Sequence, residues 1–149
     1  MPLKQEHEAL HDQLRQATQA GGEVGELAET LARLMHPHFV KEDQIALPPL
    51  GLLAALAHGD ATPEMAGVLA LTDQLEAELP AMLAEQQAIV DALQRLRDAA
   101  QRAGCSEIVH FTQQLMQHAR TEEEVMYPAA ILVGKFVRQR LGQPKPAAG

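Results

Sequence analysis

Two segments of this 149-residue chain repeat one pattern at an offset of 80 residues. Residues 38–48 read HFVKEDQIALP, and residues 118–128 read HARTEEEVMYP. Each has a histidine, an acidic pair four and five residues later, and a proline ten residues later. A second pair of segments, EHEALHDQL at 6–14 and EQQAIVDAL at 85–93, matches at an offset of 79. The chain therefore reads as a helical hairpin followed by a copy of itself.

The composition favours helices. Hydrophobic residues make up 46% of the chain but aromatic residues only 3%, so the apolar content lies mainly in Ala, Leu, Met, Val and Ile, alongside Glu, Gln and Arg. Most of these are strong helix formers. We expect an all-α fold, an up-down-up-down four-helix bundle built from two pseudo-repeated hairpins. One domain should span residues 1–142, and residues 143–149 (QPKPAAG) should form a disordered tail.

Glycine and proline residues set the expected helix boundaries. The first helix should cover about residues 3–19, and the second should run from about 24 to 48, with a bend at Pro37 and a short extension to 57. The third should run from 62 to 103 with an interruption at Pro80, and the fourth from 106 to 141 with a break at Pro128.

The charge and the N-terminal sequence exclude several classes of protein. A net charge of −8 argues against a nucleic-acid surface and against adhesion to an anionic membrane, because both need clustered Lys and Arg. The N-terminus has no apolar segment of signal-peptide type. Cys105 is the only cysteine, so no internal disulfide can form. We therefore expect a soluble, cytoplasmic protein; nothing in the sequence identifies a protein partner.

The repeated histidine and acid suit a metal site. Residues four apart on a helix lie on one face, so His38 with Glu42, and His118 with Glu122, can project together into the bundle. Buried imidazoles and carboxylates are costly unless they are paired or coordinate a cation. Solvated His–Glu pairs on helix surfaces are the alternative, but they do not explain two pairs in register with a second repeated block.

On these residues the chain resembles the hemerythrin-like proteins of the HHE cation-binding family, over roughly residues 4–135. The family pattern has Glu-His on the first and third helices and H-x3-E-E on the second and fourth. The matching positions here are His7, His38, Glu42, His118 and Glu122, whereas Gln86 stands where the pattern has histidine. The resemblance implies a pair of non-haem irons in the bundle core, with terminal imidazoles and bridging carboxylates. It also implies that O₂ or a related small oxidant binds there.

Gln86 suggests an asymmetric site, because its amide is a weaker ligand than imidazole. His11, one turn after His7, offers a further imidazole, although a partly buried histidine without a ligand role is nearly as good an explanation. We hypothesise that one metal is held by three histidines and two carboxylates: His7, His11, His38, Glu42 and Glu122. The poorer second position would have His118, the shared carboxylates and Gln86. Iron, as a pair or a single ion, rests on the resemblance; Mn or Zn would also suit these donors.

Three other residues are expected outside the site. His36 lies about 200° from His38 around an ideal helix, and His110 lies two turns before His118. Tyr127, nine residues after His118, should face the opposite side of the helix. Two other functions stay open: a redox enzyme acting on peroxide or nitric oxide at the same iron, and a metal-poor bundle that acts through protein contacts.

Overall fold

The computed structural model describes residues 2–142, so the expected disordered tail at 143–149 lies outside the described residues. The described chain is helical and contains no strand, which confirms the all-α prediction. Its elements, in chain order, are α1 (Pro2–Thr18), α2 (Gly22–Ile45), α3 (Leu47–Leu50), α4 (Leu53–Ala57), the 3₁₀ helix η1 (Pro63–Val68), α5 (Leu69–Arg102), α6 (Ser106–Thr121), the π-helical turn η2 (Glu122–Met126) and α7 (Tyr127–Leu141).

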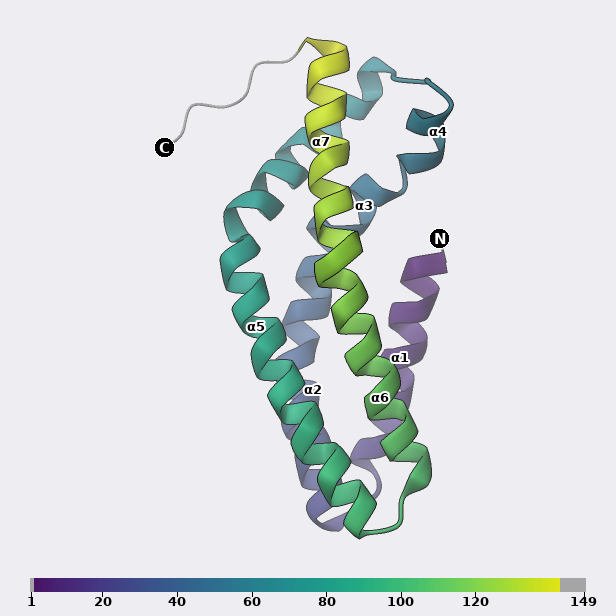
Figure 1. Ribbon diagram of the computed structural model, residues 1–149, viewed down its shortest axis with the longest axis vertical. Coiled ribbons are helices and arrows are strands. Elements are labelled where there is room, and N and C mark those ends of the chain that lie inside the picture. Colours follow the sequence, from purple (N-terminus) through teal and green to yellow (C-terminus); the bar gives the residue numbers. More distant parts are fainter. Residues whose placement is uncertain (1, 143–149) are drawn as a thin grey trace.

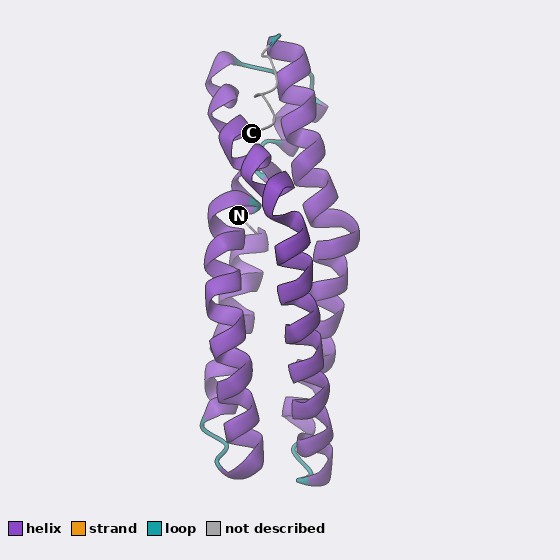
Figure 2. Cartoon of the chain, turned by 90° about the vertical axis from the view of Figure 1, so that its left-hand side faces the viewer, coloured by secondary structure: helices purple, strands orange, loops and turns teal. Residues whose placement is uncertain are grey.

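The long helices lie side by side as a bundle (Figure 1). Helix α2 packs against α1 and α5, and α6 packs against α5 and α1. The turns after α1 and after α5 lie at the same end of the molecule (Figures 1 and 2). Both turns contain glycines with positive φ, 75° at Gly21 and 72° at Gly104, a conformation that residues with a Cβ rarely adopt. These short turns place each helix beside its neighbour in the sequence.

The core consists of apolar clusters separated by a polar layer. One cluster includes Phe39 of α2 and Ile89 of α5, and the next includes Ile45 and Met82 of the same two helices. Between them along α2 lies the fully buried Glu42, and α5 carries a buried glutamine at the same level. The bundle therefore holds a band of polar side chains where hydrocarbon would otherwise continue.

The four prolines that were expected to disturb helices differ in their effects. Helices α2 and α5 continue through Pro37 and Pro80, so the predicted interruption at Pro80 is wrong. A proline inside a helix removes one backbone donor, and the buried residues on both sides of Pro80 keep α5 packed into the core. The repeat prolines, Pro48 and Pro128, have larger effects: α2 ends at Ile45, three residues before Pro48, and Pro128 is the second residue of α7, just after the π-helical turn.

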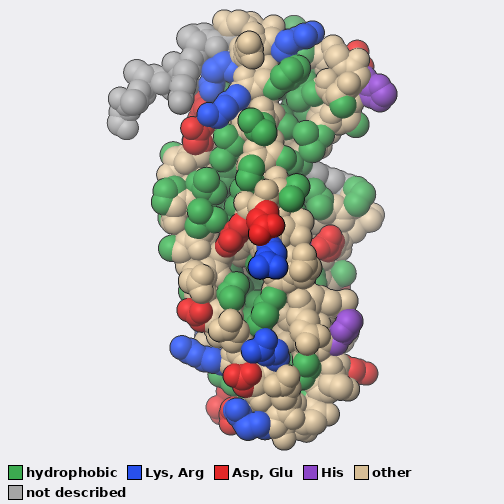
Figure 3. All heavy atoms as spheres, viewed as in Figure 1, with side chains coloured by type: hydrophobic (Ala, Val, Ile, Leu, Met, Phe, Trp, Pro, Cys, Tyr) green, Lys and Arg blue, Asp and Glu red, His purple; other side chains and the backbone are tan. Residues whose placement is uncertain are grey.

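The outer surface mixes charged and apolar side chains. Figure 3 shows hydrophobic side chains over the upper half of one face, around α7 and the start of α5. Leu132 and Phe136 of α7 are 62% and 41% exposed. Within residues 2–142, no helix is long and apolar enough to cross a membrane.

Candidate metal centre

The polar layer brings together six of the seven residues that the sequence predicted for the site. They come from α1, α2, α5, α6 and the π-helical turn, and none is more than 5% exposed: His7, His38, Glu42, Gln86, His118 and Glu122. Such burial of ionisable groups is expensive without compensating interactions. Their convergence from five elements therefore indicates a preorganised binding site.

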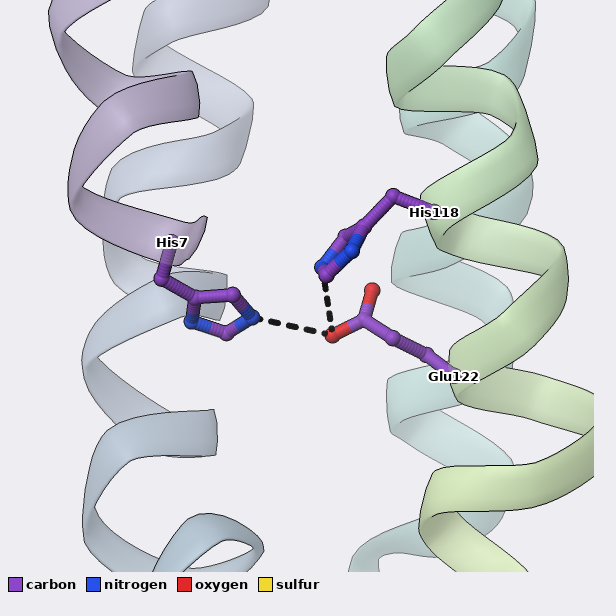
Figure 4. Close-up of side chains that lie close together, drawn as sticks. All are labelled: His7, His118 and Glu122. Carbon is purple, nitrogen blue, oxygen red and sulfur yellow. Dashed lines mark ion pairs between the residues drawn. The ribbon is translucent and has the colours of Figure 1, made fainter. Parts of the chain in front are cut away.

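Two groups of candidate ligands share one carboxylate. In the first group, His7 of α1 faces Glu122 across the bundle and His118 lies one turn before it, with their Nε2 atoms 3.4 and 3.5 Å from its Oε2 (Figure 4). In the second group, His38 Nε2 lies 3.0 Å from Glu42 Oε1, and Glu122 completes the set. The ligand atoms of each group lie within 4.8 Å of one another. Two cations could therefore occupy neighbouring positions on either side of Glu122.

This grouping differs from the expected one. His7 was assigned to the same metal as His38, but it lies in the group of His118. The reason is that neighbouring helices contribute to one position: α1 packs against α6 across the bundle as well as against α2. Glu42 still reaches towards both groups, because its Oε2 lies 3.6 Å from His7 Nε2.

Each of the three buried imidazoles is oriented by a carboxylate outside the layer. Asp43 Oδ1 lies 3.3 Å from His7 Nδ1, and Glu85 Oε1 lies 3.4 Å from His38 Nδ1. Because an ionised carboxylate only accepts hydrogen bonds, each Nδ1–H is the donor.

Glu6 holds the third imidazole, with its Oε1 2.6 Å from His118 Nδ1. The Nε2 lone pairs are consequently presented to the centre of the bundle, the arrangement typical of metal-ligating histidines.

Several inward-facing atoms have no hydrogen-bond partner. Within the described chain, five buried nitrogen and oxygen atoms of this layer lack one: His7 Nε2, His118 Nε2, both carboxylate oxygens of Glu42, and Glu122 Oε2. Buried polar atoms are rarely left unpaired, and such cases need an explanation. Imidazole nitrogens and carboxylate oxygens are ligands for transition-metal cations. The residues present therefore fit a cation at this place.

Gln86 sits in the layer as a hydrogen-bond donor. Its Nε2 donates to the carbonyl oxygen of Ala119 and to Glu122 Oε1, both at 3.2 Å. An amide nitrogen that donates to a carboxylate does not present a lone pair. In this arrangement Gln86 orients Glu122, and within the described chain no His, Asp or Glu of α5 belongs to either group.

Tyr127 is the site residue that the sequence reasoning placed on the wrong face. Its side chain is fully buried, and its hydroxyl donates to His38 Nε2 over 3.2 Å. The cause is the π-helical turn, in which the Tyr127 amide bonds to the carbonyl of Glu122, five residues back. A π turn advances each residue by a smaller angle than an α turn, so counting at 100° per residue fails. Pro128, which cannot donate to the carbonyl four residues earlier, was the available signal.

Burial changes the proton affinity of two groups in the layer. Burial lowers the pKa of His118, with the neighbouring His7 acting in the same direction and Glu6 opposing it. Burial also raises the pKa of Tyr127, and the negative charge of Glu42 adds to this. Both shifts favour the neutral side chain, because a charged form would lose its hydration.

The other histidines lie apart from the layer. His11 belongs to neither ligand group; its ring centroid lies 5.9 Å from that of His36 and 6.2 Å from that of Phe39. His36 and His110 are exposed, as expected. His11 therefore packs beside the layer rather than within it.

The comparisons with known proteins agree with this geometry. The sequence matches the family model of the hemerythrin HHE cation-binding domain over residues 2–130. Neither the search of curated proteins nor the search of solved structures gave a match. The family match covers most of the chain and includes all six residues of the polar layer. The chain belongs to the hemerythrin HHE cation-binding family.

Proposed function

We propose that this chain is a non-haem iron protein that binds O₂ or a related small oxidant at its bundle core. The observation that carries the proposal is the set of five buried nitrogen and oxygen atoms without hydrogen-bond partners in the described chain. The proposal includes an up-down-up-down topology for four long helical segments, namely α1, α2, α5, and α6 continued through η2 into α7. The short turns after α1 and α5 support this topology.

The ligand residues would form two neighbouring cation positions. His7 and His118 would hold one cation and His38 and Glu42 the other, with Glu122 common to both. Two carboxylates with neutral imidazoles leave net negative charge in a dry core, which favours occupation by divalent cations. Iron bound there would supply a redox-active centre with a coordination position open to a small oxidant.

The supporting residues would keep this site rigid. The outer carboxylates fix the imidazole tautomers before any ion arrives, so ligand orientation needs no rearrangement. Apolar clusters lie on both sides of the layer, and its six residues are all at most 5% exposed, which limits the access of water. Exclusion of water limits hydrolysis and proton leakage during oxidant chemistry.

Iron loading of matched variants tests the proposal. The protein is reconstituted with Fe(II) without oxygen, desalted, and analysed for iron content and visible absorption before and after O₂ is admitted. We expect retained iron and a reversible spectral change. His118→Gln should lose iron, whereas His110→Gln, an exposed histidine on the same helix, should not. No retained iron in the wild-type protein would contradict the proposal.

One observation supports a second candidate. Because Gln86 donates to Glu122 rather than presenting a ligand, the chain could have lost tight metal binding and act through protein contacts. A cation that binds only the folded chain must raise its thermal stability. Unchanged thermal unfolding at saturating Fe(II) would favour this second candidate.

A further inference from the structure

Among the differences between the repeated halves of the chain, two fall on residues of the polar layer. His7 has Gln86 as its counterpart in the second half, so an imidazole is missing there. Tyr127 has Leu47 as its counterpart in the first half, since each directly precedes the repeat proline. Tyr127 therefore adds a phenol to a site in which Gln86 stands in place of one imidazole.

The phenol oxygen lies at the position with fewer nitrogen ligands. Tyr127 Oη is 3.2 Å from His38 Nε2, and Glu42 Oε1 is 3.0 Å from the same nitrogen. Two ligands about 2.0–2.1 Å from one ion are about 2.9 Å apart at right angles and about 3.4 Å apart at a tetrahedral angle. Both separations thus match those of neighbouring ligands on a single ion.

We propose that Tyr127 is a metal ligand, binding through its phenol oxygen at the position formed by His38, Glu42 and Glu122. This inference rests on the proposed iron function. Tyrosine oxygen is an established protein ligand of iron. On binding, the phenol O–H bond breaks, an oxygen–metal bond forms, and one proton leaves to solvent with no change in oxidation state.

The alternative role for Tyr127 is to orient His38 by donating a hydrogen bond. Two features oppose it. His38 already has its Nδ1 held by Glu85, so its tautomer and ring orientation are fixed without a second partner. A hydrogen bond from Tyr127 to Nε2 would also occupy the lone pair that His38 needs to bind a cation. Coordination of one ion by both groups removes this competition for the lone pair.

The composition makes the test unusually clean. The chain has one tyrosine and no tryptophan, so a phenolate signal can come only from Tyr127. In the ferric protein we expect a phenolate-to-iron absorption band, with phenolate ring modes in the Raman spectrum excited within that band. Titration with redox-inert Zn(II) should shift the near-UV tyrosine absorption towards that of phenolate. Both measurements use the unaltered chain and do not depend on activity.

Tyr127→Phe is the matched variant, since it removes the oxygen and keeps the ring. We expect it to bind iron and to lose the phenolate band completely. Wild-type protein that retains iron without this band, or a band that persists in Tyr127→Phe, would refute the ligand role while leaving the proposed function intact. Wild-type protein that retains no iron would refute both.

Discussion

Glu6→Gln tests how far the outer carboxylates control the metal centre. Glu6 Oε1 lies 2.6 Å from His118 Nδ1, and the Glu6 side chain is 51% exposed, so the change should not disturb the core. Glutamine keeps the shape and can still accept the hydrogen bond, but without the charge that strengthens it. His118 Nε2 then becomes a weaker donor towards a cation.

The expected loss can be calculated. Removing such a supporting contact lowers metal affinity by about 10- to 100-fold, equivalent to about 1.4–2.7 kcal/mol. At a saturating metal concentration the folded chain loses the same amount of metal-dependent stabilisation. For a chain of this size this corresponds to a decrease of about 3–11 °C in the metal-dependent rise in Tm.

The assay combines competition against a chromophoric chelator with thermal unfolding, with and without metal. Glu8→Gln is the control, since it removes the same charge from an exposed residue of α1 that has no ion pair within the described chain. Glu85→Gln should have a smaller effect than Glu6→Gln, because Glu85 is 3.4 Å from its imidazole and also pairs with Lys41. Equal affinities for Glu6→Gln and Glu8→Gln would refute the reasoning.

Three further changes probe the site and the packing around it. Gln86→His should supply the imidazole that the second half of the chain lacks and raise the retained metal towards two ions per chain. Unchanged stoichiometry by elemental analysis would argue against an asymmetric site. Gly134→Ala should destabilise the fold by about 1–3 kcal/mol in urea unfolding, because its new Cβ would lie 2.5 Å from the Cβ of Thr72. Gly67→Ala, where nothing lies within 4 Å, should change stability little. In the metal-free protein, the lowered pKa of His118 means that the unfolded chain takes up this proton first as the pH falls through about 6.5, so stability should decrease as the pH is lowered through that value. Urea unfolding should show a smaller drop in His118→Gln; an identical drop would exclude this histidine as a cause.

The ligand pairs within single helices were predictable from the sequence. His38 with Glu42 and His118 with Glu122 share a face because the α-helix fixes the angle between residues four apart, whatever the rest of the chain does. The repeat then indicated that both pairs point into one core. Which imidazoles lie in the same ligand group was not predictable, because this depends on how α1 packs across the bundle.

The errors have a common physical origin in backbone winding and tertiary packing. Tyr127 was placed on the far side of its helix because the count assumed uniform α-helical turns. Pro80 was expected to interrupt α5, but burial of its neighbours outweighs one missing hydrogen bond. His11 was left open between a ligand and a partly buried histidine without that role, and one further turn along α1 carries it past the polar layer towards His36.

The π-helical turn at Glu122–Met126 has a consequence for how a duplicated chain can diverge. One loosened turn changes the rotational phase of everything beyond it, so Tyr127 reaches the interior although the preceding residues keep the repeat pattern. If the same residues were wound as a regular α-helix, the phenol would turn away from His38, with all the ligand side chains still present in the sequence. Two repeated halves of a chain can thus place different side chains in a site because one helical turn is wound differently.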